Sequence, residues 1–146
     1  MKHILISGGS RGIGAALVRG LCDAGFRVSF LYKNAKDKAT ALASDCGANA
    51  ICCDVSDPDA VRAAVGEARR AGGEIHALIC NAGISHVGLS RDITDAELRR
   101  VLDTNLAGAM YLCREAQGDM IRAGGGRILC IGSMWGKVGA SMEVAY

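Results

Sequence analysis

A glycine-rich segment near the start of the chain has the properties of an anion-binding turn. It follows the apolar run Ile4–Ile6 and places glycines at positions 8, 12 and 14, where a helical pattern begins. Without side chains, the backbone can turn sharply and approach a pyrophosphate, whose charge then lies against free amides at the helix start. The spacing Gly-x-x-x-Gly-x-Gly differs from the usual dinucleotide fingerprint, so a turn without a ligand is the alternative interpretation. The residues expected to contact a dinucleotide here are Gly8, Ser10, Arg11, Gly12, Ile13 and Gly14.

The charges around this turn favour NADP(H) over NAD(H). The second apolar run ends in Leu31-Tyr32-Lys33-Asn34 and has no acid to hold a ribose 2′-hydroxyl. Arg11 in the turn and Lys33 after the run are instead placed to neutralise a 2′-phosphate. The third apolar run continues into Asp54 and Val55, at the edge where the adenine would lie. Asp54 is either an acceptor for the adenine amino group or a turn-forming acid ahead of the next helix.

One hydroxyl, that of Ser133, follows the last apolar run. Side chains just past the carboxyl end of a strand lie where α/β sheets bind ligands, so Ser133 can hold a substrate carbonyl; the alternative is a serine that caps a helix. No Gly-x-Ser-x-Gly segment surrounds it, and none of the three histidines is an evident base. A hydrolase is therefore disfavoured.

The elements that position these residues alternate along the chain. Apolar runs predict strands at 3–7, 27–32, 50–53, 76–80 and 127–132, and helical periodicity predicts helices at 13–24, 35–46, 58–71 and 95–122. Asp57-Pro58 and the Thr94/Glu97 capping box mark two helix starts, and Gly25 and Gly47 mark two helix ends. This alternation predicts a single α/β domain over residues 1–146, a doubly wound, Rossmann-type parallel sheet with strand order 3-2-1-4-5 and helices on both faces.

Composition excludes several other classes of protein. The chain has 146 residues, half of them apolar, and a net charge of +2, too small to indicate nucleic-acid binding. No apolar run approaches a membrane span and no signal-peptide pattern is present, so we expect a cytoplasmic protein that binds neither nucleic acid nor membrane. The seven cysteines include no Cys-x-x-Cys pair, so no metal site is expected. Cys52, Cys80 and Cys130 lie inside apolar runs, and most of the seven cysteines are expected as small buried apolar residues.

Together, two motifs resemble the classical short-chain dehydrogenase/reductase family: Ser7–Gly14 after the first predicted strand, and Asn81-Ala82-Gly83 after the fourth. The resemblance extends over the whole chain through Asn105, Ser133 and Tyr146. It implies that Asn81, Ala82 and Gly83 adjoin the cofactor, with Asn81 bracing the central strand. It also implies that Tyr146 donates a proton to a ketone oxygen and that Asn105 holds a water in a proton relay. Asn105 lies among Leu98, Val101, Leu102, Leu106 and Ala109, so a purely structural hydrogen bond is the alternative for its amide.

In the family, a lysine four residues after the tyrosine stabilises its phenolate, and further strands and helices follow. The sequence ends at Tyr146, so we expect a C-terminally truncated fragment of a homodimeric or homotetrameric parent. The motifs look most like NADPH-dependent 3-oxoacyl-[acyl-carrier-protein] reductases, which act in fatty acid synthesis. The segment 134–146 also looks like reductases of a 5-aminopentanone group on elongation factor P. A non-catalytic NADP-binding fragment is the third interpretation.

Overall fold

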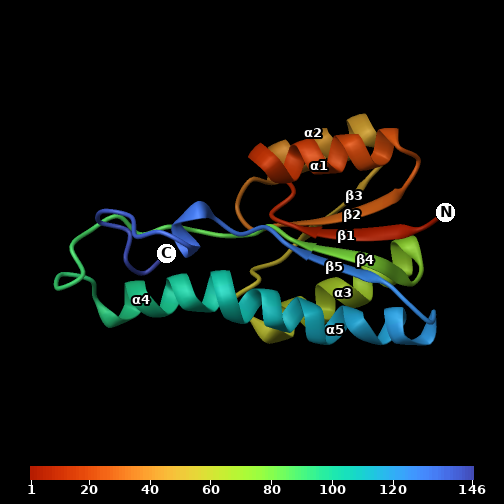
Figure 1. Cartoon of the computed structure of the whole chain (residues 1–146). Helices are drawn as coiled ribbons and strands as arrows, with labels where there is room; N and C mark the ends of the chain where they lie inside the picture. Colours follow the sequence, from red (N-terminus) through yellow and green to blue (C-terminus); the bar gives the residue numbers. More distant parts are fainter.

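The apolar runs form one parallel sheet in the computed structural model, which describes all 146 residues (Figure 1). The strands are β1 (His3–Ser7), β2 (Arg27–Tyr32), β3 (Asn49–Cys52), β4 (Ile75–Cys80) and β5 (Arg127–Cys130). Their order is β3-β2-β1-β4-β5, which confirms the predicted topology, with each boundary within two residues of the prediction. Because every strand is parallel, the carboxyl ends of β1, β4 and β5 meet at one edge of the sheet.

Helices cover both faces of the sheet, so the predicted three-layer arrangement is confirmed. Figure 1 shows α1 and α2 on one face, and α3, α4 and α5 on the other. Their bounds are α1 (Gly12–Asp23), α2 (Lys36–Cys46), α3 (Pro58–Gly72), α4 (Asp95–Leu102), the π-helical turn η1 (Asp103–Ala107), α5 (Gly108–Arg122) and the 3₁₀ turn η2 (Met134–Gly136). None of these helices combines the length and the apolar character needed to cross a bilayer.

The helix ends follow the local signals in the sequence. The Asp57 carboxylate accepts hydrogen bonds from two backbone N–H groups of the first turn of α3, and Thr94 and Glu97 form the expected capping box of α4. Gly47 ends α2 in the left-handed conformation at φ 66°, where a side chain would be strained. Because each signal acts within a few residues, these ends could be read from the sequence without tertiary information.

The last predicted helix differs from the structure in two ways. The segment expected as one helix is interrupted by η1, whose widened turn contains Asn105. The apolar face assigned around Asn105 is also wrong: Val101 is buried, whereas Leu102 and Leu106 are 45% and 59% exposed. The periodic pattern contains two apolar stripes, and the core includes the one through Leu112, Ala116 and Met120.

The cysteine prediction holds for only one of the three strand cysteines. Cys80 is buried in the inner strand β4, but Cys52 and Cys130 are exposed on β3 and β5, the outer strands of the sheet that these 146 residues form. An apolar run shows that a segment is a strand; it does not show whether that strand lies at the edge.

A buried carboxylate joins the helices α3 and α5 to the strand β4. Asp119 of α5 has no exposed surface and accepts hydrogen bonds from the backbone N–H of Ile75 (3.0 Å) and from Nε of Arg69 (2.9 Å). Burial alone would raise the pKa of Asp119, but these donors and Arg122 hold it below the ordinary value. The network ties α3, α5 and the start of β4 together, and it carries no sequence signature.

Candidate active site

The glycine turn after β1 is shaped by contacts that leave no room for side chains. A Cβ on Gly14 would lie 2.1 Å from the carbonyl oxygen of Gly8, and a Cβ on Gly8 would lie 2.9 Å from Cα of Ala82. Gly12 has open space around it, but its φ of 54° lies in the left-handed region that other residues rarely adopt. The start of α1 at Gly14 therefore lies in close contact with the turn that follows β1.

The same turn presents unpaired amides to an anion. The first hydrogen bond into α1 runs from the N–H of Ala15 to the carbonyl of Arg11 at 3.2 Å, so the N–H groups of Gly12, Ile13 and Gly14 precede it. No side chain caps α1, and its first turn contains no acid. A dinucleotide pyrophosphate fits this cradle, because free N–H groups and the positive end of the helix dipole face it without a competing carboxylate.

Asn81 braces the turn from β4, as the family resemblance implied. Its Nδ2 donates to the carbonyl oxygens of Ser7 and Gly8, both at 3.1 Å. In the reverse direction, the hydroxyl of Ser7 accepts from the N–H groups of Asn81 and Ala82 at 3.0 and 3.1 Å. The sequence analysis missed this role of Ser7. Only the pairing of β1 with β4 brings the two strand ends together, so no local signal could have revealed it.

Lys33 and Asp54 pair with each other across the ends of β2 and β3. The ammonium of Lys33 forms an ion pair with the Asp54 carboxylate, which also accepts from the N–H (3.1 Å) and hydroxyl (2.7 Å) of Ser56. Burial alone would raise the pKa of Asp54, but the hydrogen bonds from Lys33 and Ser56 hold it below its ordinary value. Asp54 thus has the turn-forming role. Val55 is buried against Gly108, so its side chain belongs to the core.

A basic hollow of about 390 Å³ adjoins the turn between α1 and α2. Its charged lining comes from Arg11, Arg19 and Lys38, and Ser10 contributes a hydroxyl. No acidic residue lines the hollow, although Arg19 also pairs with Asp45 at 3.4 Å. Arg11 and Ser10 therefore lie where a phosphate group beside the turn would meet positive charge. Lys38 was missed because it lies inside the predicted second helix, away from any motif.

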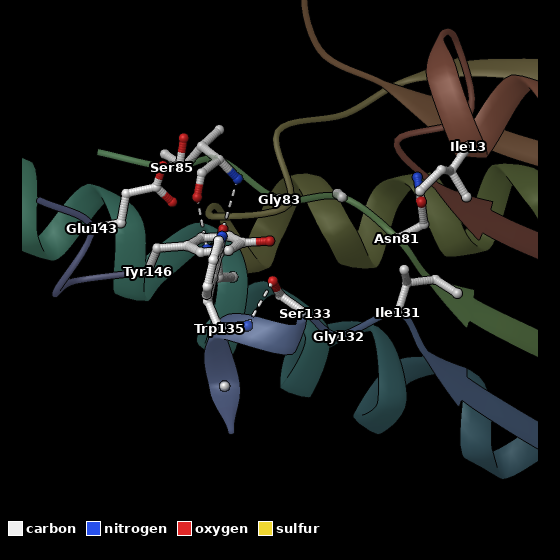
Figure 2. Close-up of a pocket in the computed structure, with 14 residues that line it drawn as sticks. Ile13, Asn81, Gly83, Ser85, Ile131, Gly132, Ser133, Trp135, Glu143 and Tyr146 are labelled. Carbon is white, nitrogen blue, oxygen red and sulfur yellow. Dashed lines mark hydrogen bonds between the residues drawn. The ribbon is translucent and has the colours of Figure 1, made fainter. Parts of the chain in front are cut away.

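A larger cavity of about 600 Å³ opens at the carboxyl edge of the sheet (Figure 2). Its lining residues are Ile13, Asn81, Ala82, Gly83, Ile84, Ser85, Asn105, Ile131, Gly132, Ser133, Trp135, Gly136, Glu143 and Tyr146. Figure 2 shows Ile13 and Asn81 at one end, Glu143 and Ser85 at the other, and Ser133 and Tyr146 between them. The structure thus brings the three predicted catalytic side chains, Asn105, Ser133 and Tyr146, into the cavity that continues from the glycine turn.

Ser133 combines the two roles left open by its sequence. Its hydroxyl oxygen accepts a hydrogen bond from the N–H of Trp135 at 3.2 Å and so caps the short turn η2. Because a hydroxyl has one donor and two acceptor sites, this bond leaves its proton free to point into the cavity. The capping interaction fixes the position of Ser133 and leaves its hydroxyl proton available to a substrate.

The amide of Asn105 is held by the backbone of Ile84. Oδ1 accepts from the Ile84 N–H and Nδ2 donates to the Ile84 carbonyl, both at 2.8 Å. This pairing supplies the polar partner that the Asn105 amide was expected to need. It is the kind of structural hydrogen bond given as the alternative role of Asn105. One N–H and one lone pair of the amide remain for a further contact, since a carboxamide has two of each.

Comparison with known proteins places this geometry in a family. The model for short chain dehydrogenases matches residues 2–146. The cyclic-di-GMP-binding biofilm dispersal mediator protein of Escherichia coli is 40% identical over 92% of this chain and 54% of its own length. The 3-oxoacyl-[acyl-carrier-protein] reductase FabG of Staphylococcus aureus is 33% identical over 99% of this chain and 61% of its length.

A solved structure gives the same assignment. A blue fluorescent protein from a metagenomic library, in complex with NADPH, superposes with a TM-score of 0.91 at 35% identity, over 99% of this chain and 61% of that one. The chain thus spans between 54% and 61% of the lengths of these proteins. A matched family model, two curated relatives and a shared fold lead to one conclusion: the chain belongs to the short-chain dehydrogenase family.

Proposed function

We propose that this protein is an NADP(H)-dependent carbonyl reductase. The observation that carries the proposal is the shared cavity: Ser133 and Tyr146 line the same space as Ile13 and Asn81, beside the glycine turn. A carbonyl group between Ser133 and Tyr146 would lie next to a cofactor whose pyrophosphate occupies that turn. The NADPH-bound structural neighbour and the oxidoreductase names among the relatives support the same class of reaction.

In the proposed reaction, two side chains act on the carbonyl oxygen of the substrate. The dinucleotide, when bound, supplies a hydride to the carbonyl carbon. The free proton of Ser133 donates a hydrogen bond to the carbonyl oxygen, and the Tyr146 phenol transfers its proton to that oxygen, which gives the alcohol. Asn105, held by Ile84, has a remaining N–H and lone pair that can hold the water of a proton relay.

The preference for NADP(H) rests on Arg11 and Lys33. No acid follows β2 to bind a 2′-hydroxyl, and Arg11 lies in the basic hollow beside the turn. Because Lys33 already pairs with Asp54, Arg11 is the one of these two cations that remains free to meet a 2′-phosphate. Arg11→Ala is expected to weaken NADPH binding about tenfold and to change NADH binding little. Fluorescence titration of both cofactors measures this, with Arg62→Ala on α3 as control; equal losses for both cofactors would refute the charge argument.

Two substrate classes are proposed for the carbonyl. The FabG relative supports a 3-oxoacyl thioester, reduced to the 3-hydroxyacyl product, bound to a carrier protein or as a small molecule. The second class is an aminoketone such as the 5-aminopentanone group on elongation factor P, which the single acidic residue of the cavity, Glu143, favours. The predicted cytoplasmic location and homo-oligomeric assembly stay predictions.

Loss of NADPH absorbance in the presence of a ketone tests the reaction, with the protein encoded by the complete gene. Tyr146→Phe is expected to abolish turnover while leaving NADPH binding intact, because only the phenolic proton is removed. The non-catalytic interpretation predicts instead that the wild-type protein binds NADPH and turns over neither substrate class, which would contradict the proposal.

A further inference from the structure

One charged side chain lines the large cavity, and it is negative. Among the residues of this chain that line the cavity, Glu143 is the only acidic one, and there is no Lys, Arg or His. Glu143 is half-buried and takes part in none of the ion pairs of the molecule. No basic side chain of residues 1–146 pairs with Glu143, and its carboxylate lies where a ligand in the cavity can reach it.

Glu143 lies at the end of the cavity that the far end of a bound ketone would reach. Figure 2 shows Glu143 beyond Tyr146, at the end of the cavity opposite Ile13 and Asn81. A ketone with its oxygen at Ser133 and Tyr146 would extend its free end toward Glu143, because the cofactor turn occupies the opposite end. The cavity is also roomy enough, at about 600 Å³, for a substrate of several carbon atoms.

The backbone holds Glu143 in place at a conformational cost. Met142, the residue before it, is the only non-glycine residue with a positive φ, at 62°. The Met142 carbonyl accepts from the N–H of Gly88 at 2.7 Å, and the Glu143 carbonyl accepts from the N–H of Tyr146 at 3.1 Å. A left-handed non-glycine residue persists where surrounding contacts enforce it, often at functional sites. These contacts fix the backbone at Glu143 relative to that of Tyr146.

We propose that Glu143 selects carbonyl substrates that carry a cationic group, an ammonium or a quaternary ammonium, a few bonds beyond the carbonyl. The cation would lie against the Glu143 carboxylate, and the indole of Trp135 in the same cavity adds a surface that attracts cations. The inference rests on the proposed carbonyl reduction and decides between its substrate classes. An aminoketone satisfies the carboxylate, whereas a neutral 3-oxoacyl chain would desolvate it without compensation.

A matched pair of ketones tests this selectivity. One is a methyl ketone with a trimethylammonium group three methylenes from the carbonyl; the other carries a tert-butyl group of nearly the same shape and no charge. The quaternary nitrogen prevents cyclisation to an imine. We expect the protein encoded by the complete gene to reduce the cationic ketone with about fivefold higher kcat/KM, and this ratio to fall as ionic strength rises.

Two variants assign the effect to its source. Glu143→Gln is expected to lower the cationic-to-neutral ratio to about one, by the same factor of about fivefold. Glu67→Gln, which removes an exposed carboxylate from α3, is expected to keep the wild-type ratio. Glu143→Asp keeps the charge and should retain part of the preference, which separates charge from misfolding.

The outcomes distinguish the inference from the reaction on which it rests. Reduction of both ketones with a ratio near one in the wild type, or an unchanged ratio in Glu143→Gln, would overturn the selectivity and leave carbonyl reduction standing. Failure to reduce either ketone, or a 3-oxoacyl thioester, despite NADPH binding would overturn both.

Discussion

Adding one methyl group at Gly14 is expected to disable the cofactor turn. The Cβ of Gly14→Ala would lie 2.1 Å from the Gly8 carbonyl oxygen and 2.8 Å from Nδ2 of Asn81, whereas ordinary contacts begin at 3.4 Å. The start of α1 must therefore move away by about 1 Å, since the Gly8 oxygen belongs to the backbone and the Asn81 amide is held by its own hydrogen bonds. The movement also stretches the bonds from Asn81 to the carbonyls of Ser7 and Gly8.

The expected cost of Gly14→Ala follows from these contacts. Overpacking costs about 1–3 kcal/mol, and each weakened hydrogen bond about 1 kcal/mol. Removing a glycine from a helix returns about 1 kcal/mol. The net loss in the free energy of unfolding is about 3 kcal/mol, and NADPH affinity should fall as well because the amides of Gly12 and Ile13 move with the helix.

A matched substitution on the same helix provides the control. A Cβ on Gly20 of α1 would meet nothing within 4 Å, so Gly20→Ala should gain up to about 1 kcal/mol from helix propensity alone. Urea unfolding gives the two stabilities, and fluorescence titration gives the two NADPH affinities. If Gly14→Ala proved as stable as Gly20→Ala and bound NADPH as tightly as wild type, the close-approach reasoning would be refuted.

Two further predictions concern buried ionisable groups away from the cavity. Asp119→Ala is expected to cost about 3–5 kcal/mol, because it leaves Arg69 and the Ile75 N–H without their buried acceptor; an unchanged urea midpoint would contradict this. His3 is fully buried, with its ring nitrogens 3.0 Å from the Gly73 carbonyl and 2.9 Å from the Ser29 hydroxyl, and burial lowers its pKa. The lowered pKa favours the neutral ring in the folded protein, so its contribution to stability is complete above the ordinary value of 6.5 and is lost as pH falls through the lower folded pKa. Unfolding free energies measured from neutral to mildly acidic pH should decline less steeply in His3→Asn; parallel curves would rule out this role for His3.

The sequence predicts those features of the fold that depend on neighbouring residues. The positions of the strands and helices, the capping box at Thr94 and Glu97 and the sharp turn at Gly14 each rest on local periodicity, caps or glycine positions. The pairing of Lys33 with Asp54 could not be predicted in this way, because it joins the ends of two strands separated by a helix. That pairing changes the argument about the cofactor, since a cation counted as free from the sequence is already partnered.

The cavity shows a similar dependence on tertiary structure. Glu143 lies close to Tyr146 in sequence but could not be assigned, because its importance comes from its place in the cavity, where it is the one charged side chain among the lining residues of this chain. The exposed Leu102 and Leu106 illustrate the opposite error, in which an apolar pattern was assigned to the core face. Both cases depend on which way a side chain faces, and periodicity alone leaves that open when two stripes are available.

Structural and catalytic interpretations of a polar residue do not exclude each other. The Ser133 oxygen accepts from the Trp135 N–H, and this fixes where the oxygen lies, yet the hydroxyl proton is left for a carbonyl. Asn105 likewise uses one N–H and one lone pair on Ile84 and retains another of each. A catalytic group works best when its position is already determined before the substrate arrives, because no free energy is then needed to order it in the transition state. The hydrogen bonds that suggest a purely structural role therefore explain how Ser133 and Asn105 can keep fixed positions relative to Tyr146.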